Sequence, residues 1–377
     1  MNNNTKYVGL DVSKEEIAVA IAEEGRGKPR YFGMISHTPE AIRKLVKKLG
    51  KPENLKMCYE AGPTGYPLYR MFMSMGIECD VIAPSLIPQK PGERVKTDKR
   101  DAMSLAGLFR AGELTSIYVP SKEDEALRDL VRAREDVKDD ILRIKHRITK
   151  LLLRYGIRAP QKVGRNWSAK YREWIYTVKF EYRPVRIAFR EYLQILHETE
   201  QRLKRLEGEI QAEAENGVHA PIIQALQCLR GVATITATGL AAEIGSFGRF
   251  PTPKKFMAFL GLVPSESSSG ASRKQGDITK TGNVHARKLL IEAAWSYRLQ
   301  PAVRDKLKKR QNGQPGAILD ISWKAQTRLH KRFHRLMSRG KASNKAVTAV
   351  ARELAGFIWA IAKEVEENRP EKEVVLN

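Results

Sequence analysis

Two carboxylates three positions apart, Asp98 and Asp101, are residues whose types and spacing suggest chemistry. From Lys99 the chain has apolar residues at helical spacing, and Thr97 or Asp98 can cap the start of that helix. Side chains three apart share one helical face, with their Cβ atoms roughly 5–6 Å apart. Carboxylates held that close repel each other unless something positive neutralises them. Two interpretations of these acids are open. They can lie at a solvated helix start, where they complement the helix dipole, or they can form part of a metal site.

Two further acids stand within or at the end of short apolar stretches. Asp11 interrupts the run 7–12, which together with the run 17–22 predicts a β-hairpin, and Glu60 ends a predicted strand over 55–60. An ionised carboxylate inside a core strand is unfavourable unless it is paired or bound to a metal. Mg²⁺ prefers carboxylate oxygens, and two such ions roughly 3.5–4 Å apart can assist phosphoryl transfer. We therefore select four candidate metal ligands: Asp11, Glu60, Asp98 and Asp101.

The elements that would position these acids alternate along the first third of the chain. Helical periodicity over 39–49 precedes the strand over 55–60, and a helix over 66–75 precedes another strand over 79–84. Strand, helix and strand at this spacing imply parallel strands and an α/β fold. We predict this domain over 1–118, with the arrangement of a ribonuclease-H-like sheet on which acids converge.

A different pattern follows, in which apolar residues repeat at alternating spacings of three and four. These heptads occupy 127–155 and 189–214, with one polar interruption at Arg134 and densely charged outward positions. We interpret them as antiparallel coiled-coil arms that mediate self-association, within a region over 119–218. Ordinary amphipathic helices that pack on a core are the alternative.

The insert between the two heptad stretches, residues 156–187, mixes basic and aromatic side chains. Cations bind phosphates and aromatic faces stack on unpaired bases, so this insert is a candidate nucleic-acid surface. A small helical cap whose aromatic residues are core is the alternative. The residues we select here are Trp167, Lys170, Arg172 and Trp174.

The remaining chain, a region over 219–366 and a tail over 367–377, is predicted to be mostly helical. Two helices around the turn 229–232 resemble a helix–hairpin–helix phosphate binder, although Ala233 stands where a second turn glycine is expected. The stretch 264–283 is so rich in serine, glycine and cations that we expect a loop, which could hold phosphate or present a serine nucleophile. Candidate phosphate contacts here and in the next helix are Arg273, Lys274, Lys280 and Arg287.

Composition restricts the partners. The 377 residues are 42% hydrophobic, which is enough for two or three domains with real cores. A formal charge of +24 and a pI near 9.9 indicate a polyanionic partner, most simply nucleic acid. No apolar run is long enough to span a bilayer, and the N-terminus lacks the apolar core of a signal peptide. Three scattered cysteines without zinc-ligand spacing predict buried thiols in a reducing cytoplasm.

Motifs spread over nearly the whole chain resemble those of the IS110/IS1111 insertion-sequence transposases, also called bridge-RNA-guided recombinases. The matching stretches are YVGLDVSK from Tyr7, YEAGPTG from Tyr59, KTDKRDA from Lys96, LGLVPS from Leu260 and ITKTGN from Ile278. The resemblance implies that the four acids form a DEDD signature in a RuvC-like domain that binds Mg²⁺.

The resemblance also implies a serine nucleophile that forms a phosphoserine with DNA. Ser269, directly before Gly270, holds that position. Two departures from the family pattern concern this site: Ala271 replaces a second glycine, and three consecutive serines leave Ser268 as the alternative nucleophile.

The implied function is a DNA recombinase that joins donor and target double-stranded DNA by Mg²⁺-dependent strand exchange. A noncoding guide RNA would supply specificity by base pairing, and the protein would be a homo-dimer or tetramer, without membrane association, in bacterial or archaeal cytoplasm at the nucleoid. One alternative is a RuvC-like Holliday-junction resolvase that hydrolyses DNA with the four acids alone. Another is a basic RNA-binding scaffold whose acids are structural.

Overall fold

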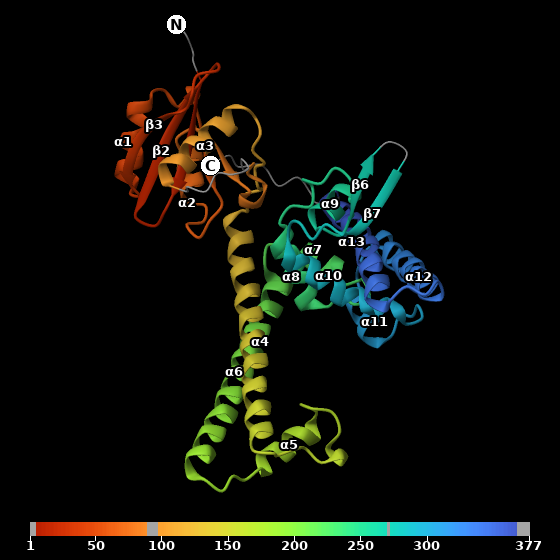
Figure 1. Ribbon diagram of the computed structural model, residues 1–377. Helices are drawn as coiled ribbons and strands as arrows, with labels where there is room; N and C mark the ends of the chain where they lie inside the picture. Colours follow the sequence, from red (N-terminus) through yellow and green to blue (C-terminus); the bar gives the residue numbers. More distant parts are fainter. Residues whose placement is uncertain (1–4, 89–96, 270–271, 368–377) are drawn as a thin grey trace. The chain divides into compact units, whose positions relative to one another are not determined.

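The computed structural model describes residues 5–88, 97–269 and 272–367, and the chain divides into two compact units, Met1–Val119 and Pro120–Asn377 (Figure 1). Lys96 in the third motif, Gly270 and Ala271 beside the predicted nucleophile, and all but the first residue of the predicted tail lie outside the described residues. The second unit contains both the predicted arms and the predicted C-terminal region.

The first unit is built on a five-stranded sheet with the order β3-β2-β1-β4-β5. Its strands are β1 (Lys6–Val12), β2 (Glu16–Glu23), β3 (Arg30–Ser36), β4 (Leu55–Glu60) and β5 (Glu78–Ile82). β1, β2 and β3 are antiparallel, whereas β4 runs parallel to β1 and to β5. The predicted hairpin and the predicted parallel strands are confirmed, and β3 is a strand that we did not predict.

Three helices cover the two faces of this sheet: α1 (Pro39–Leu49), α2 (Pro67–Ser74) and α3 (Asp98–Arg110). Alternation in β2 places its large residues in a core with α1 and α2, and its alanines against α3. The α3 face is lined by small residues from strand and helix: Ala18, Ala20, Ala22, Ala102 and Ala106. Because these side chains are short, α3 lies close against the sheet.

Gly9 in β1 lies directly beneath α3, and its missing side chain gives our first prediction. A Cβ at this position would lie 2.5 Å from the carbonyl oxygen of Ala102 and 2.9 Å from the Cβ of Leu105. Backbone atoms cannot rotate away, so Gly9→Ala should displace α3 and lower the free energy of unfolding by about 1–3 kcal/mol. Thermal unfolding measures this loss.

Gly27→Ala is the matched control for that measurement, because no atom lies within 4 Å of a Cβ at Gly27. We expect the control to unfold at the parent temperature. If the two variants unfold together, the close approach between β1 and α3 is wrong.

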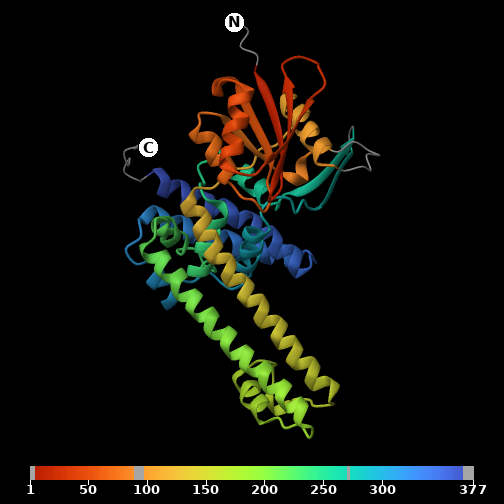
Figure 2. The ribbon, with the colours of Figure 1, turned by 90° about the vertical axis from the view of Figure 1, so that its left-hand side faces the viewer.

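The second unit begins with two long helices, α4 (Lys122–Arg154) and α6 (Arg183–Asn216), which lie side by side (Figure 2). Arg134 pairs with Glu207 and Lys145 with Glu200, so the two helices are antiparallel. The first of these pairs accounts for the polar interruption in the heptads, because the Arg134 Nε donates to Glu207 at 3.1 Å. The heptad positions are buried between helices of the same chain, and self-association of the arms stays a prediction.

The rest of the unit is mostly helical, as predicted. After the short α5 (Ala169–Thr177) within the insert, the helices are α7 (Ala220–Leu226), α8 (Thr234–Ile244), α9 (Pro253–Phe259), α10 (Val284–Ala294), α11 (Asp305–Gln311), α12 (Gly316–Ser338) and α13 (Ser343–Glu367). A turn around Gly231 joins α7 to α8, and phosphate binding at this turn stays a prediction. None of the helices in the described parts of the chain is long and apolar enough to cross a membrane.

Candidate functional site

The acid in β1 lies on the face of the sheet that α3 covers. Side chains alternate along a strand, so Tyr7, Gly9 and Asp11 share one face. The Tyr7 ring packs edge-on against Phe109 near the end of α3, with ring centroids 5.7 Å apart, while Gly9 lies beneath Ala102 near its start. α3 therefore runs antiparallel to β1, and its first turn lies toward the end of the strand that carries Asp11.

Glu60 reaches the same end of the sheet through strand register. The parallel ladder between β1 and β4 ends at the pair Leu10–Tyr59, so Asp11 and Glu60 follow next to each other on adjacent strands. Cys58 packs against α3, and residues two apart in a strand share a face. Glu60 is exposed at the carboxyl end of β4, on the α3 side.

The other two acids belong to the first turn of α3. Thr97 is the N-cap, and its hydroxyl accepts a hydrogen bond from the backbone N–H of Arg100 at 3.4 Å. Asp98 is exposed and Asp101 is half-buried. Both acids complement the positive end of the helix dipole, which is the structural role we set beside the catalytic one. The topology thus directs all four acids to one end of one sheet face.

The donor set is suited to a hard divalent cation. Within residues 5–88, 97–269 and 272–367, no three His, Cys, Asp or Glu side chains are grouped closely enough to hold a metal ion. The four predicted ligands therefore share an end of the sheet but do not enclose a coordination site. Every one of them offers carboxylate oxygens, which are the ligands that Mg²⁺ takes, so the chemistry of the set fits this ion.

The predicted serine loop is instead a β-hairpin, which corrects our expectation. β6 (Pro264–Ser269) pairs antiparallel with β7 (Ser272–Ile278), and Ser269 lies opposite Ser272. Ser267, Ser268 and Ser269 are all exposed. The Ser268 hydroxyl donates to Glu266 on its own strand at 2.8 Å. Successive strand residues face opposite sides, so Ser268 and Ser269 present their hydroxyls in opposite directions.

The base of this hairpin is fixed to the helical core. The backbone N–H of Lys280 donates to the carbonyl of Gly261 at 3.1 Å, which ties the end of β7 to the segment before β6. Gly282 has φ 72° and leaves no room for a Cβ, which would collide with the carbonyl oxygen of Phe259. The motif residues around the hairpin thus hold it in place.

Arg287 has a structural role within the protein, and the phosphate contact that we predicted for it stays a prediction. Its side chain is buried, and its guanidinium donates to the carbonyl oxygens of Leu260 and Thr281, both at 2.9 Å. These bonds connect the segment before β6 to the segment after β7. Lys274 and Lys280 are exposed on the hairpin side, and the side chain of Arg273 lies outside what the structure describes.

A buried carboxylate connects the same base to the first arm. Glu243 on α8 is 3% exposed and accepts hydrogen bonds from Arg132 of α4 at 2.8 and 3.1 Å. It also accepts from the Nδ2 of Asn283, the N-cap of α10, at 2.7 Å. Burial alone would raise the pKa of Glu243, but the hydrogen bonds and charge of Arg132, with the Asn283 bond, lower it below its ordinary value of 4.5.

This network gives a pH-dependent prediction. Because the pKa of Glu243 is lower in the folded state than in the unfolded state, its ionised form stabilises the fold at pH values above the unfolded-state pKa. This stabilisation is lost as the pH falls through the folded-state pKa. Glu243→Gln should therefore lower the free energy of unfolding by about 1–3 kcal/mol at pH 7 and by less near pH 4. Urea unfolding at both pH values measures the difference. The exposed Glu198→Gln in α6 is the control, and a gap that is equal at both pH values would refute the linkage.

The predicted nucleic-acid residues of the insert are partly engaged within the protein. Trp167 and Trp174 are half-buried and pack on the core of the arms. Arg172 forms two hydrogen bonds with Glu200, at 2.8 and 2.6 Å, whereas Lys170 is exposed. The tryptophans are therefore only partly accessible, and their contact with bases stays a prediction.

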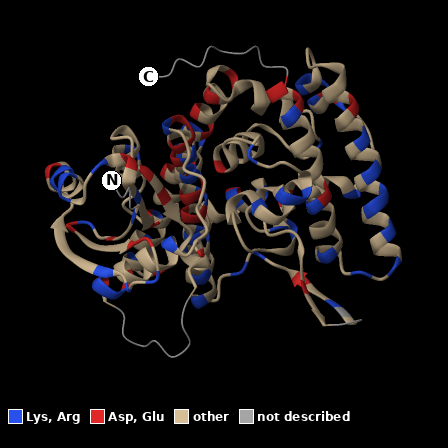
Figure 3. Ribbon diagram, turned by 90° about the horizontal axis from the view of Figure 1, so that it is seen from above, with Lys and Arg blue, Asp and Glu red and all other residues tan. Residues whose placement is uncertain are grey.

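Lys and Arg residues lie on many elements rather than on a single one (Figure 3). One cationic groove, of about 610 Å³, is lined mainly by α12 through Arg328, Lys331, Arg332 and Arg335. Glu353 of α13 pairs with Arg328 at 2.9 Å and with Arg332 at 3.1 Å. Our set of nucleic-acid residues omitted this groove, although cations at helical spacing signal it in the sequence.

A mixed sheet with four acids directed to one end, followed by a helical domain, defines a ribonuclease-H-like DEDD protein with a helical partner domain. Comparison with protein families supports this class. Residues 8–157, which include all four acids, match a DEDD transposase family model, and residues 223–308, which include the serine hairpin, match the model described as transposase IS116/IS110/IS902 family.

Individual relatives agree along nearly the whole length. The chain is 43% identical to a putative transposase of Sinorhizobium fredii, over 96% of this chain and 89% of the relative. It is 32% identical to the transposase for insertion sequence element IS1533 of Leptospira borgpetersenii, over 89% and 97% of the two chains. It is 25% identical to the transposase for insertion sequence element IS1111A of Coxiella burnetii, over 97% of this chain and 91% of the relative. The chain belongs to the IS110/IS1111 family of insertion-sequence transposases, enzymes that cleave and rearrange DNA.

Proposed function

We propose that this transposase is an RNA-guided recombinase, which joins donor and target DNA through a phosphoserine formed on Ser269. The observation that carries this proposal is the serine hairpin. Its hydroxyls are exposed, and its base is locked to the core by Gly282 and Arg287. An exposed hydroxyl on a rigid support is the arrangement that a nucleophile needs. The buried cysteines are less suited to act as the nucleophile. Burial raises the pKa of the Cys228 thiol, for example, to about 11, which disfavours the reactive thiolate.

In this mechanism the serine oxygen forms a bond to a DNA phosphorus while one strand oxygen leaves. The phosphoester that results retains the energy of the broken bond, so a hydroxyl of the incoming strand can displace the serine without ATP. Lys274 and Lys280 would hold the phosphate and its developing charge. Asp11, Glu60, Asp98 and Asp101 would hold Mg²⁺ near the scissile phosphate. When bound, the ion supplies charge stabilisation at that phosphate and lowers the pKa of an attacking hydroxyl.

The same proposal assigns the remaining regions. The DEDD domain would cover 1–118, the arms and insert 119–218 and the catalytic serine domain 219–366. The arms and the insert would bind the noncoding guide RNA, the arms would assemble a dimer or tetramer, and the +24 charge would hold the RNA and two DNA duplexes. Guide pairing would read sequence, while the protein reads backbone and shape. The bacterial or archaeal nucleoid would be the place of action.

One experiment tests this proposal as a whole. The full chain is purified from cells that carry the element, the RNA that co-purifies is sequenced, and donor and target DNA matched to that RNA are supplied with Mg²⁺. We expect recombinant product only when RNA and DNA match. Recombination that proceeds equally without RNA would remove the guide from the proposal, and no product from matched substrates would refute it.

A Holliday-junction resolvase is the second candidate, because all four acids lie in the unit Met1–Val119 while the serines lie in the other unit. Such an enzyme would hydrolyse DNA with the acids alone. Mg²⁺-dependent nicking that persists in serine variants and leaves no protein–DNA adduct would favour it. A non-enzymatic RNA-binding scaffold would show no strand cleavage at all.

A further inference from the structure

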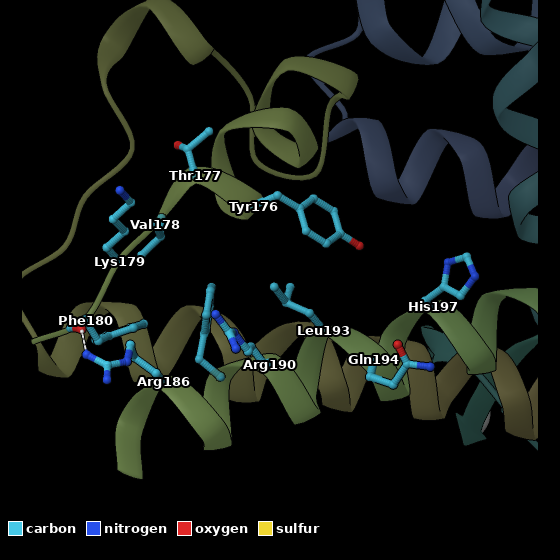
Figure 4. Close-up of a pocket in the computed structure, with 11 residues that line it drawn as sticks. Tyr176, Thr177, Val178, Lys179, Phe180, Arg186, Arg190, Leu193, Gln194 and His197 are labelled. Carbon is cyan, nitrogen blue, oxygen red and sulfur yellow. Dashed lines mark hydrogen bonds between the residues drawn. The ribbon is translucent and has the colours of Figure 1, made fainter. Parts of the chain in front are cut away.

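A cavity of about 840 Å³ lies where the two arms are joined, between the segment after α5 and the first turns of α6 (Figure 4). Its floor is apolar and belongs to the core of the arms: Phe180, Phe189 and Leu193 are 7%, 4% and 7% exposed. The volume falls within the roughly 300–1,000 Å³ that is usual for small-molecule sites. This floor can receive a flat, apolar surface.

The rim of the cavity is aromatic and cationic. Tyr176 is 64% exposed, and its ring projects from α5 toward α6 (Figure 4). Lys179 and Arg190 line the cavity and are exposed, and within the described part of the chain neither forms an ion pair or hydrogen bond. No acidic residue is among those that line it, as far as the described residues show. The rim therefore favours an anion beside the apolar floor.

We infer that this cavity binds one unpaired nucleotide of an RNA. The base would lie on the floor and stack on Tyr176, and the flanking phosphates would contact Lys179 and Arg190. This inference rests on the proposed RNA binding and gives it a defined site. An apolar ligand would contact the apolar floor but not the cations, and a sugar phosphate would contact the cations but not the floor. A nucleotide would contact both, through its base and its phosphate.

The chemistry points to RNA with a bulged or looped base. A base inside a duplex is stacked on both faces and cannot enter the cavity, whereas unpaired RNA bases are splayed out and stack on aromatic side chains. The proposed DNA substrates are double-stranded, so the guide RNA is the partner that offers such bases. The half-buried tryptophans of the insert pack on the core of the arms and support the segment that carries Tyr176.

The test compares an RNA hairpin that has one bulged nucleotide with the same hairpin fully paired, by equilibrium binding to the full chain. We expect the parent to prefer the bulged hairpin, and Tyr176→Ala to weaken binding of that hairpin on the order of tenfold while binding of the paired one is unchanged. Tyr176→Phe keeps the ring and should retain the preference. Tyr182→Ala is the matched control, because Tyr182 is also 64% exposed but does not line the cavity.

A second variant keeps the inference independent of the tyrosine. Lys179→Gln should weaken bulged-hairpin binding and reduce its salt dependence, as loss of one phosphate contact does. Equal binding of both hairpins by the parent, or equal effects of Tyr176→Ala and Tyr182→Ala, would overturn the nucleotide site while leaving RNA binding intact. A bulged DNA hairpin that shows the same Tyr176 dependence would overturn the RNA assignment. A parent that binds neither RNA hairpin would refute the proposed function itself.

Discussion

Asp11→Asn is expected to abolish strand exchange, with a loss on the order of a hundredfold or more, while guide RNA binding changes less than about twofold. The substitution keeps the size of the side chain and removes one negative charge from the α3 face of the sheet. Charge stabilisation at a bound metal ion contributes several kcal/mol to a phosphoryl-transfer transition state, and each 1.36 kcal/mol changes a rate about tenfold. RNA binding should be retained because the proposed RNA contacts lie in residues 119–218.

Asp80→Asn is the matched control for this variant. Asp80 is half-buried like Asp11 and pairs with Cys58, so it lies on the same face of the same sheet, farther from the end where the four acids lie. We expect it to retain strand exchange, measured as recombinant product with matched RNA and DNA. Full activity of Asp11→Asn would remove Asp11 from the site, and equal losses in both variants would mean that the fold rather than the chemistry was damaged.

The arrangement of these acids could be predicted further than the rest of the site, for a physical reason. Parallel strands bring their carboxyl ends to one edge, and the sequence predicts such a pair from 55–60 and 79–84. The parallel pairing of β1 with β4, which places Asp11 next to Glu60, comes from the structure. The orientation of α3 could not be read in the same way. It depends on the small-residue face of β2 and on the contact between Gly9 and Ala102, which are long-range packing facts.

The two strand errors have different causes. β3 carries an apolar and aromatic run around Gly33, so the sequence does contain a strand signal at this position. The hairpin of β6 and β7 carries almost no apolar residues, and serine-rich stretches favour turns over strands. Pairing with each other and a base anchored at Gly282 hold these strands together instead of a hydrophobic face.

The charged and aromatic residues show what composition cannot decide. Arg287 and Lys280 looked equivalent in the sequence, yet one is buried beneath the hairpin and the other is exposed. Trp167 is half-buried while Tyr176 is largely exposed, because the pairing of α4 with α6 determines which face of the insert is covered. Neighbouring elements in space determine which side of a helix or strand is buried. In a short, charged helix the sequence periodicity gives little indication of which side that is.

The covalent intermediate should depend on one serine. A denaturing gel with end-labelled DNA would show a protein–DNA adduct as a shifted band, and Ser269→Ala is expected to eliminate both this band and strand cleavage. A methyl group offers no oxygen to phosphorus, and neighbouring hydroxyls cannot replace it without a change of geometry. Ser267 lies on the same side of β6 but about 6–7 Å along the strand, and Ser268 faces the opposite side.

These directions make the three serine variants a register test. Ser267→Ala is the same-side control and should form the adduct at the parent level. Ser268→Ala should also form it, because its hydroxyl is directed toward Glu266 rather than toward the side that Ser269 presents. An adduct that persists in Ser269→Ala and disappears in Ser268→Ala would move the nucleophile by one residue and turn the opposite side of the hairpin toward DNA. If both variants still form it, the nucleophile lies outside the hairpin, and the phosphoserine assignment is wrong.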